Sequence, residues 1–120
     1  MEQSHEEAAK WYLKAAEQGY DRAQTNLALL YKYGRGVKQS YIETVKWYQK
    51  AADQGYARAQ DRLGMCYDAG LGVGRSCSEA MKWFLKAAEQ GNRNSQYKAG
   101  CHYMSGNGGG YVFDCRSIHN

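Results

Sequence analysis

The strongest constraint on the fold of this chain is a ten-residue block that occurs three times at a fixed spacing. It begins at Lys10 as KWYLKAAEQG, and it returns at Lys46 as KWYQKAADQG and at Lys82 as KWFLKAAEQG. Each copy lies 36 residues after the one before it. Self-similarity at a period of roughly 20–50 residues is typical of solenoids and other repeat arrays. The fold therefore follows from the structure of one repeat and from the stacking of repeats.

Two further blocks recur in the same register. One places a small residue, an apolar residue and a tyrosine at intervals of four, and the other is a turn rich in glycine. Residues at i, i+4 and i+8 lie on one face of a helix, and glycine adopts the positive φ that a tight helix exit needs. Each repeat is therefore predicted to hold a helix A, a glycine turn and a helix B. The blocks are Ala23…Leu27…Tyr31, Ala59…Leu63…Tyr67 and Ser95…Ala99…Tyr103, with turns at Gly34-Arg35-Gly36-Val37, Gly70-Leu71-Gly72-Val73 and Gly106-Asn107-Gly108-Gly109.

The predicted repeat array occupies residues 1–105. A pair of short helices cannot bury its apolar face alone, so stacked neighbours have to supply the core. The predicted fold class is thus all-α, an α-solenoid of stacked antiparallel helix pairs. The glycine-rich tail at 106–120 is assigned no fixed structure. The array begins with helix B at 5–18, continues with repeats at 21–55 and 57–91, and ends with helix A at 93–105; the helices inside the two repeats are expected at 21–33, 41–53, 57–69 and 77–90.

The composition excludes several protein classes. Of the 120 residues, 43% are hydrophobic and 23% are charged, which is too apolar for a disordered tail and too charged for a membrane protein. No run approaches the roughly 18 apolar residues of a membrane span, so none is predicted. The net charge of +4 is spread along the chain instead of being clustered, so we expect no nucleic-acid partner.

The first seven residues, MEQSHEE, are polar and acidic. A secretory signal peptide instead joins a positively charged start to an apolar run. As the chain stands, we expect a cytoplasmic protein. A piece of a longer periplasmic or secreted protein would show the same sequence, and an array that starts on a B helix and stops after an A helix is expected of a fragment or a truncated gene product.

Three tryptophans, Trp11, Trp47 and Trp83, share one repeat position beside the small residues of helix B. Exposed tryptophans could form a stacking platform for bases or sugars. Their recurrence at one helical position favours core packing instead, and all three are predicted to be buried.

The sequence SQYK at 95–98 matches the S-x-x-K motif of penicillin-recognising enzymes. Ser95 stands where the other repeats have Ala23 and Ala59, which is a small inward position, whereas Lys98 aligns with residues on the outer side. Neither S-D-N nor K-T-G accompanies the motif. We therefore predict no catalytic residue, and the chain is not expected to be an enzyme.

Taken together, these blocks resemble the Sel1-like repeat family, which is related to tetratricopeptide repeats. The resemblance rests on the 36-residue period, the GxGV turn, the KWY/F..AA.QG helix and the A…LG…Y block of Ala59, Leu63, Gly64 and Tyr67, and it covers residues from about 5 to 105. A tetratricopeptide array would show a period of about 34 residues and usually a proline after helix B. This chain contains no proline.

The resemblance implies a right-handed superhelix whose A helices line the concave side. It also implies a non-enzymatic adaptor or scaffold in complex assembly, signalling or host–microbe contact. Some cysteine-rich members of the family bind or hydrolyse β-lactams, and some carry a disulfide between helices A and B of each hairpin. These properties are expectations for the present chain.

The four cysteines give no complete metal pattern. Cys101, Cys115 and His119 form half of a zinc motif, but the first C-x2-C pair is missing, so no metal and no cofactor are predicted. Cys66 and Cys77 lie 11 residues apart across one A–B turn, where a disulfide of the family type would fit. This spacing does not recur in the other repeats. We expect free thiols.

Without visible chemistry, function is expected on the exposed strip of the A helices, opposite the buried Leu27. The repeats agree at inward positions and differ along this strip, although solvent positions without a partner would also differ. Its basic and aromatic residues suit a peptide or protein with acidic groups. The strip comprises Arg22, Thr25, Asn26, Leu29 and Tyr33, then Arg58, Asp61, Arg62, Met65 and Ala69, then Asn94, Tyr97, Lys98, Cys101 and Ser105; the partner-binding candidates are Arg22, Asn26, Tyr33, Arg58, Arg62, Met65, Tyr97 and Lys98.

The predicted function is therefore a protein-interaction module that docks a peptide or partner protein on the concave face. Two alternatives remain open from the residues. One is a β-lactam-binding or β-lactam-hydrolysing protein, and the other is a structural fragment that self-associates through the open ends of its array.

Overall fold

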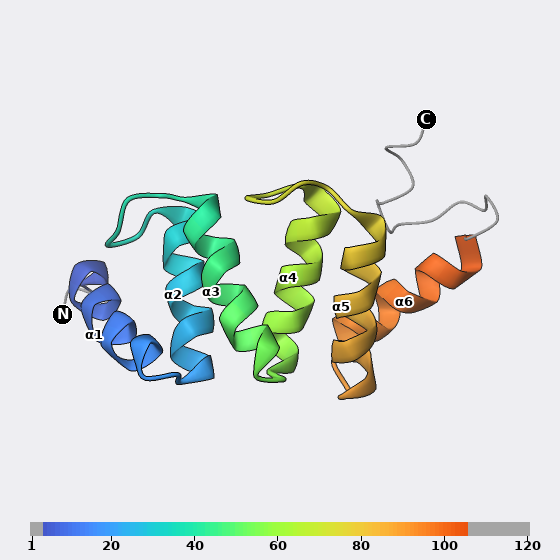
Figure 1. Ribbon diagram of the computed structural model, residues 1–120, viewed down its shortest axis with the longest axis horizontal. Coiled ribbons are helices and arrows are strands. Elements are labelled where there is room, and N and C mark those ends of the chain that lie inside the picture. The colour runs from blue at the N-terminus through green and yellow to red at the C-terminus, as the bar shows by residue number, and fades with distance from the viewer. Residues whose placement is uncertain (1–3, 106–120) are drawn as a thin grey trace.

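The computed structural model describes residues 4–105, which form six α-helices of 13 residues each. Successive helices run antiparallel and lie side by side along one axis (Figure 1). No strand occurs within this part of the chain. Each predicted helix is present, and no bound differs from its prediction by more than one residue. The helices are α1 (His5–Glu17), α2 (Asp21–Tyr33), α3 (Tyr41–Asp53), α4 (Ala57–Ala69), α5 (Cys77–Glu89) and α6 (Arg93–Ser105).

The ends of these helices follow from local sequence. At the start of α3, the Ser40 hydroxyl accepts a hydrogen bond from the Glu43 backbone N–H at 3.1 Å, and Ser4 and Ser76 cap α1 and α5 in the same way. Such caps satisfy backbone donors that the first helical turn leaves free. The A helices α2 and α4 end at Gly34 and Gly70, whose φ angles of 67° and 73° are left-handed.

The A–B turns also fix how consecutive repeats meet. A Cβ atom built on Gly36 would overlap the backbone of His5, and one built on Gly72 would overlap the backbone carbonyl of Tyr41. Each turn therefore touches the start of the B helix in the preceding repeat. The predicted role of these glycines in the turn is confirmed by their positive φ, and close backbone approach is a second reason for glycine here.

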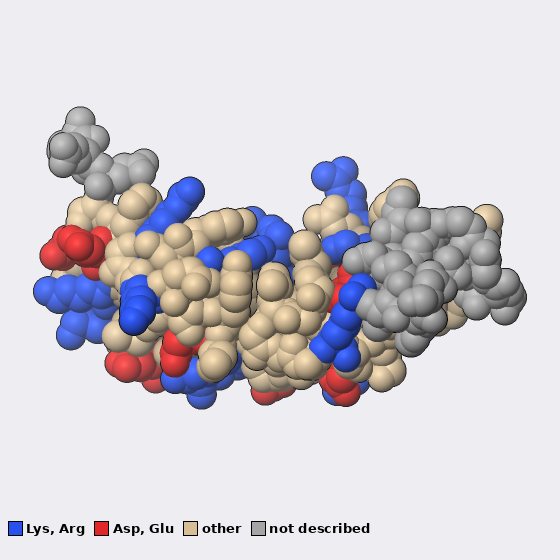
Figure 2. Space-filling view, turned by 90° about the horizontal axis from the view of Figure 1, so that it is seen from above, with Lys and Arg blue, Asp and Glu red and all other residues tan. Residues whose placement is uncertain are grey.

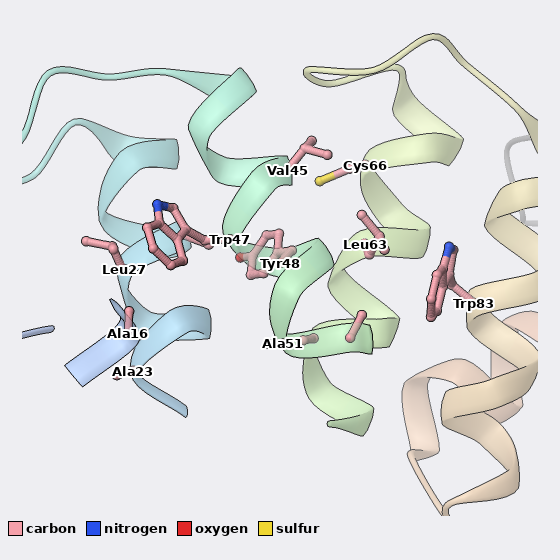
Figure 3. Close-up of a cluster of buried hydrophobic side chains, with 13 residues drawn as sticks. Ala16, Ala23, Leu27, Val45, Trp47, Tyr48, Ala51, Leu63, Cys66 and Trp83 are labelled. Carbon is pink, nitrogen blue, oxygen red and sulfur yellow. The ribbon is translucent and has the colours of Figure 1, made fainter. Parts of the chain in front are cut away.

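The core lies between the two rows of helices (Figure 3). Trp47 is 5% exposed and lies beside Leu27 of α2, while Trp83 is 6% exposed and lies on the side of α5 that faces Leu63 of α4. The prediction of core packing is confirmed for these two tryptophans. It is wrong for Trp11, which is 61% exposed, because the described helices leave most of its indole ring uncovered.

A ladder of glutamines links the repeats. The Gln24 side-chain amide donates to the Ala16 carbonyl at 3.1 Å, and its oxygen accepts from Gln54 at 2.9 Å. One repeat later, Gln60 donates to the Ala52 carbonyl at 3.2 Å and accepts from Gln90 at 2.8 Å. Since Gln24 and Gln60 are each 4% exposed, these bonds satisfy buried polar groups that would otherwise oppose stacking.

The cysteines differ from the expectation of free thiols. Cys66 is a free thiol, so the Cys66–Cys77 bridge is not formed. Cys77 is nevertheless disulfide-bonded. The expectation was wrong at Cys77 because the spacing of cysteines along one hairpin does not reveal pairing across the fold. Cys115 and His119 of the half zinc motif lie outside the described residues, as does the tail at 106–120.

Between residues 4 and 105, no helix is long and apolar enough to cross a membrane. Within the same part of the chain, no three His, Cys, Asp or Glu side chains are grouped so that they could hold a metal ion.

Candidate functional site

Most of the predicted strip is accessible, but two of its residues are not. Thr25 is 5% exposed and Asp61 is 2% exposed, so placing them on the open surface was wrong. The side of an A helix opposite its core residue is not wholly free, because the A helix of the following repeat covers part of it. Asp61 shows this directly, since it contacts two side chains of α6.

Three of the predicted candidates come together in one pocket of about 150 Å³ between α2 and α4. Asn26 projects from α2, and Arg58 and Arg62 project from α4, one helical turn apart. Tyr48 of α3 also lines the pocket although only 2% of its surface is exposed, so it closes the inner end. We call this the arginine pocket; its full lining is Thr25, Asn26, Leu29, Tyr48, Arg58 and Arg62.

The electrostatics of the arginine pocket favour an anion. Burial raises the pKa of Tyr48 to about 12, against the opposing influence of Arg62 and Arg58. The phenol therefore remains a neutral O–H donor at ordinary pH, beside two permanent positive charges. None of the ion pairs among residues 4–105 involves Arg58 or Arg62. Two guanidinium groups, a phenol and an amide thus offer donors to a negatively charged group.

The equivalent space between α4 and α6 is filled from within. The Asp61 carboxylate accepts a hydrogen bond from the Ser95 hydroxyl at 2.6 Å and pairs with the Lys98 ammonium at 3.3 Å. Lys98 also lies over the Phe84 ring, 4.8 Å from its centroid. Ser95 is fully buried, which confirms its inward position. Lys98 is half-buried and turned toward Asp61, so its assignment to the outer side was incomplete.

The remaining four candidates, like Lys98, lie outside the lining of the arginine pocket. Arg22 is exposed, and the neighbouring Tyr20 and Tyr56 raise its pKa. Tyr33 is 57% exposed and Tyr97 is 64% exposed, and a hydrogen bond with Cys101 raises the pKa of Tyr97. Met65 is half-buried and packs against the core between α5 and α6. These side chains give the strip accessible aromatic and basic groups at several places.

Sequence reasoning did not identify Tyr48 as a residue of the site. The signal was nevertheless present, because Tyr48 aligns with Phe84 across one 36-residue period and only the tyrosine carries a hydroxyl. Thr25 and Asp61 share a repeat position in the predicted strip, and sequence reasoning missed that both are buried. A carboxylate in one repeat and a hydroxyl in the other make the two inter-repeat spaces chemically different.

The Tyr48 hydroxyl has a measurable consequence at alkaline pH. Its pKa is about 12 in the folded chain against 10.0 for an exposed tyrosine, so above pH 10 the unfolded chain loses this proton first and stability falls as pH rises. We expect Tyr48→Phe to remove a loss on the order of 2 kcal/mol across that window. Urea unfolding at several pH values from neutral to strongly alkaline checks this. An unchanged alkaline slope in Tyr48→Phe would contradict it, and Tyr41→Phe, at an exposed position, is the matched control.

Basic side chains are not gathered into one stripe on the surface. Figure 2 shows Lys and Arg spread over several elements of the face seen from above, with acidic groups among them. The candidate site on the A helices is therefore a local arrangement of a few side chains.

The fold defines an all-α scaffold of stacked helical repeats. The Sel1 repeat matches the chain in four consecutive segments, at residues 1–20, 21–56, 57–92 and 93–113. The chain belongs to the Sel1 repeat family. No curated protein matches it.

Two solved structures show the same architecture. A Sel1 repeat protein from Oxalobacter formigenes is 42% identical with a TM-score of 0.83, over 90% of this chain and 44% of that one. A protective antigen present in uropathogenic Escherichia coli strains, which displays an SLR fold, is 43% identical with a TM-score of 0.84, over 88% of this chain and 23% of that one. The chain thus spans less than half the length of either protein. Sel1 repeat proteins generally act in protein–protein interaction.

Proposed function

We propose that this chain is a non-enzymatic interaction module that binds a peptide or partner protein on the concave face of its A helices. The observation that carries the proposal is the arginine pocket, where Arg58 and Arg62 have no carboxylate partner among the described residues. Charge-assisted hydrogen bonds to guanidinium groups are strong and geometrically specific. An acidic segment is the partner that this surface suits.

The remaining candidates extend the proposed contact along the array. Tyr33 exposes its aromatic ring at the end of α2, and Tyr97 exposes its ring on α6. Aromatic and arginine side chains carry much of the binding energy in protein interfaces. An extended or helical peptide could contact these side chains together with the arginine pocket. The proposed binding residues are Arg22, Asn26, Tyr33, Arg58, Arg62, Met65, Tyr97 and Lys98.

The surroundings of Ser95 argue against the β-lactam alternative. The Ser95 hydroxyl donates to the Asp61 carboxylate, and the residue is fully buried. A serine nucleophile needs a base that takes its proton and an open approach for the substrate. Lys98 is engaged with the same carboxylate at 3.3 Å. We therefore do not assign a nucleophile to the S-x-x-K sequence.

We expect the double variant Arg58→Glu plus Arg62→Glu to lose peptide binding while keeping its helical circular dichroism and melting temperature. Random peptides displayed on phage and selected on the immobilised chain supply the ligands, and fluorescence anisotropy measures their affinity. Selected peptides should be enriched in Asp and Glu, and the double variant should bind them at least tenfold more weakly, since the pocket would then repel acidic groups.

The matched control is Lys10→Glu plus Lys14→Glu, which makes the same change in net charge at two exposed positions of α1. Equal binding by the wild type and the arginine variant, or equal loss in both double variants, would contradict the proposal. Light scattering over a concentration series separates it from self-association. A mass that rises with concentration and an absence of peptide binding would favour a self-assembling piece.

A further inference from the structure

The two inter-repeat spaces on the A-helix side differ first in the presence of an internal carboxylate. Between α4 and α6, the carboxylate of Asp61 meets Lys98 at 3.3 Å. One period earlier, Asp61 is replaced by Thr25 and Lys98 by Arg62. The cation is thus kept in both spaces, whereas the anion is present only in the second.

The Thr25 hydroxyl does not replace the missing carboxylate. It donates to the Asp21 backbone carbonyl at 3.0 Å within its own helix. The floor also changes between the two spaces, because Tyr48 lines the first where Phe84 lies beneath Lys98 in the second. In the second space the hydroxyl donor is Ser95, which aligns with Ala59 in the first space. Tyr48 supplies a hydroxyl donor to the first space instead, and Arg58 adds a second guanidinium group.

From this difference we infer that the arginine pocket receives the side-chain carboxylate of one acidic residue, a glutamate in a partner segment, at the place that Asp61 occupies in the next repeat. This inference rests on the proposed function and names the group that the site recognises. The arginine pocket has a volume of about 150 Å³, which admits the end of one side chain but not a folded domain. A carboxylate matches the forked donors of Arg58 and Arg62.

A side chain is a better occupant than the carboxyl terminus of a chain. The donors that face the pocket belong to side chains of α2, α3 and α4. Backbone N–H groups in the middle of these helices are bonded within their own helix, so none is free to hold the backbone of a terminal residue. The carboxylate that fills the second space is itself a side chain. The second space stays closed, so the inference predicts one acidic position in the partner at this site.

The decisive variant, Thr25→Asp, adds to the chain itself the carboxylate that the arginine pocket lacks. Thr25→Asp should place a carboxylate beside Arg62 as Asp61 is placed beside Lys98, and it should occupy the pocket. Thr25→Asn is the matched control, because it has nearly the same size and no charge. Both variants should keep the wild-type circular dichroism.

The probes are acetylated and amidated glycyl-glutamyl-glycine and its glutamine counterpart, titrated into the whole chain. The side-chain Nε–Hε signals of Arg58 and Arg62 are followed by NMR, with the exposed Arg93 of α6 as the internal reference. We expect saturable shifts of Arg58 and Arg62 with the glutamate probe, at least tenfold weaker binding of the glutamine probe, and no shift of Arg93. Thr25→Asp should lose the response, and Thr25→Asn should keep it.

Three results would overturn the inference. The first is an equal response to both probes, the second is an unchanged response in Thr25→Asp, and the third is tighter binding of acetyl-glycine or inorganic phosphate than of the glutamate probe. The proposed function would survive any of these if the phage-selected peptides still lost affinity for the double arginine variant. The proposed function itself would fail if the double arginine variant bound the phage-selected peptides as tightly as the wild type. That result comes from the anisotropy measurement and is independent of the NMR titration.

Discussion

Replacing Trp47 with alanine is expected to lower the free energy of unfolding by about 3–5 kcal/mol, which is the usual cost of removing a large buried side chain. Trp47 is 5% exposed and lies beside Leu27, within the cluster that joins the first A helix to the second repeat. Lys46 and Lys50 also lie over its indole ring, at 5.2 Å and 5.8 Å from the centroid. Both the apolar contacts and these cation–π contacts are lost with the ring.

The chain provides its own control at the same repeat position. Trp11→Ala removes an identical side chain from a site that is 61% exposed, so we expect a change within about 0.5 kcal/mol. Urea unfolding followed by circular dichroism measures both variants against the wild type. Equal losses in the two variants would show that Trp11 is buried in solution and would contradict the arrangement at α1.

Gly72→Ala is the second substitution with a large expected effect. Gly72 has a φ of 74°, and its added methyl group would overlap the Tyr41 carbonyl and lie 2.9 Å from a Val45 methyl. The left-handed backbone costs an L-residue roughly 1–2 kcal/mol, and forcing a side chain into packed surroundings costs roughly 1–3 kcal/mol more. We therefore expect stability to fall by about 2–5 kcal/mol, because the turn has to move away from α3.

Gly55→Ala separates the two contributions. Gly55 has a φ of 94°, but nothing lies within 4 Å of a Cβ atom built there. Only the backbone cost of roughly 1–2 kcal/mol is expected. Thermal unfolding of both variants gives the comparison. If Gly72→Ala were no more harmful than Gly55→Ala, the close contact between the A–B turn and the preceding B helix would be refuted.

The helices could be predicted from sequence because their signals are local and occur in every repeat. Leu27 and Leu63 mark the inner faces, and Gly34 and Gly70 end the A helices with left-handed φ angles. Because the pattern occurs three times, the helix prediction does not depend on the weak secondary-structure preference of any single segment. The exposure of Trp11 could not be predicted in this way, because the burial of a B-helix tryptophan depends on the helix that precedes it.

The candidate site was predicted only in part. Helical geometry placed Asn26, Arg58 and Arg62 on one side of the A helices, and the structure brings these three residues to one pocket. The same geometry left Thr25 and Asp61 exposed, because a single helix viewed alone does not show what its neighbour covers. Contacts between repeats, such as the ion pair of Asp61 and Lys98, cannot be predicted without knowing the distance between successive A helices.

The glutamine ladder could be recognised in the sequence, although a rule that places polar residues at the surface would miss it. Gln24, Gln60 and Gln96 recur at one position of the A helix, and Gln54 and Gln90 recur at the end of the B helix. Polar residues that do not vary between repeats are expected where a buried donor or acceptor must be satisfied. The structure shows these amides bonded across each described junction from α1 to α5.

This ladder also determines where the length of a repeat can vary. The link from α3 to α4 is only Gln54, Gly55 and Tyr56, and Gln54 is itself part of the ladder. One inserted residue there would turn the following helix by about 100° and break the bond. The A–B loop is more permissive beyond its second glycine, since a Cβ atom built on Gly74 meets nothing within 4 Å. Both A–B loops lie along the same edge of the array (Figure 1). Insertions and deletions tolerated during evolution would collect on that edge, giving the scaffold a second variable surface without altering the stacking of its helices.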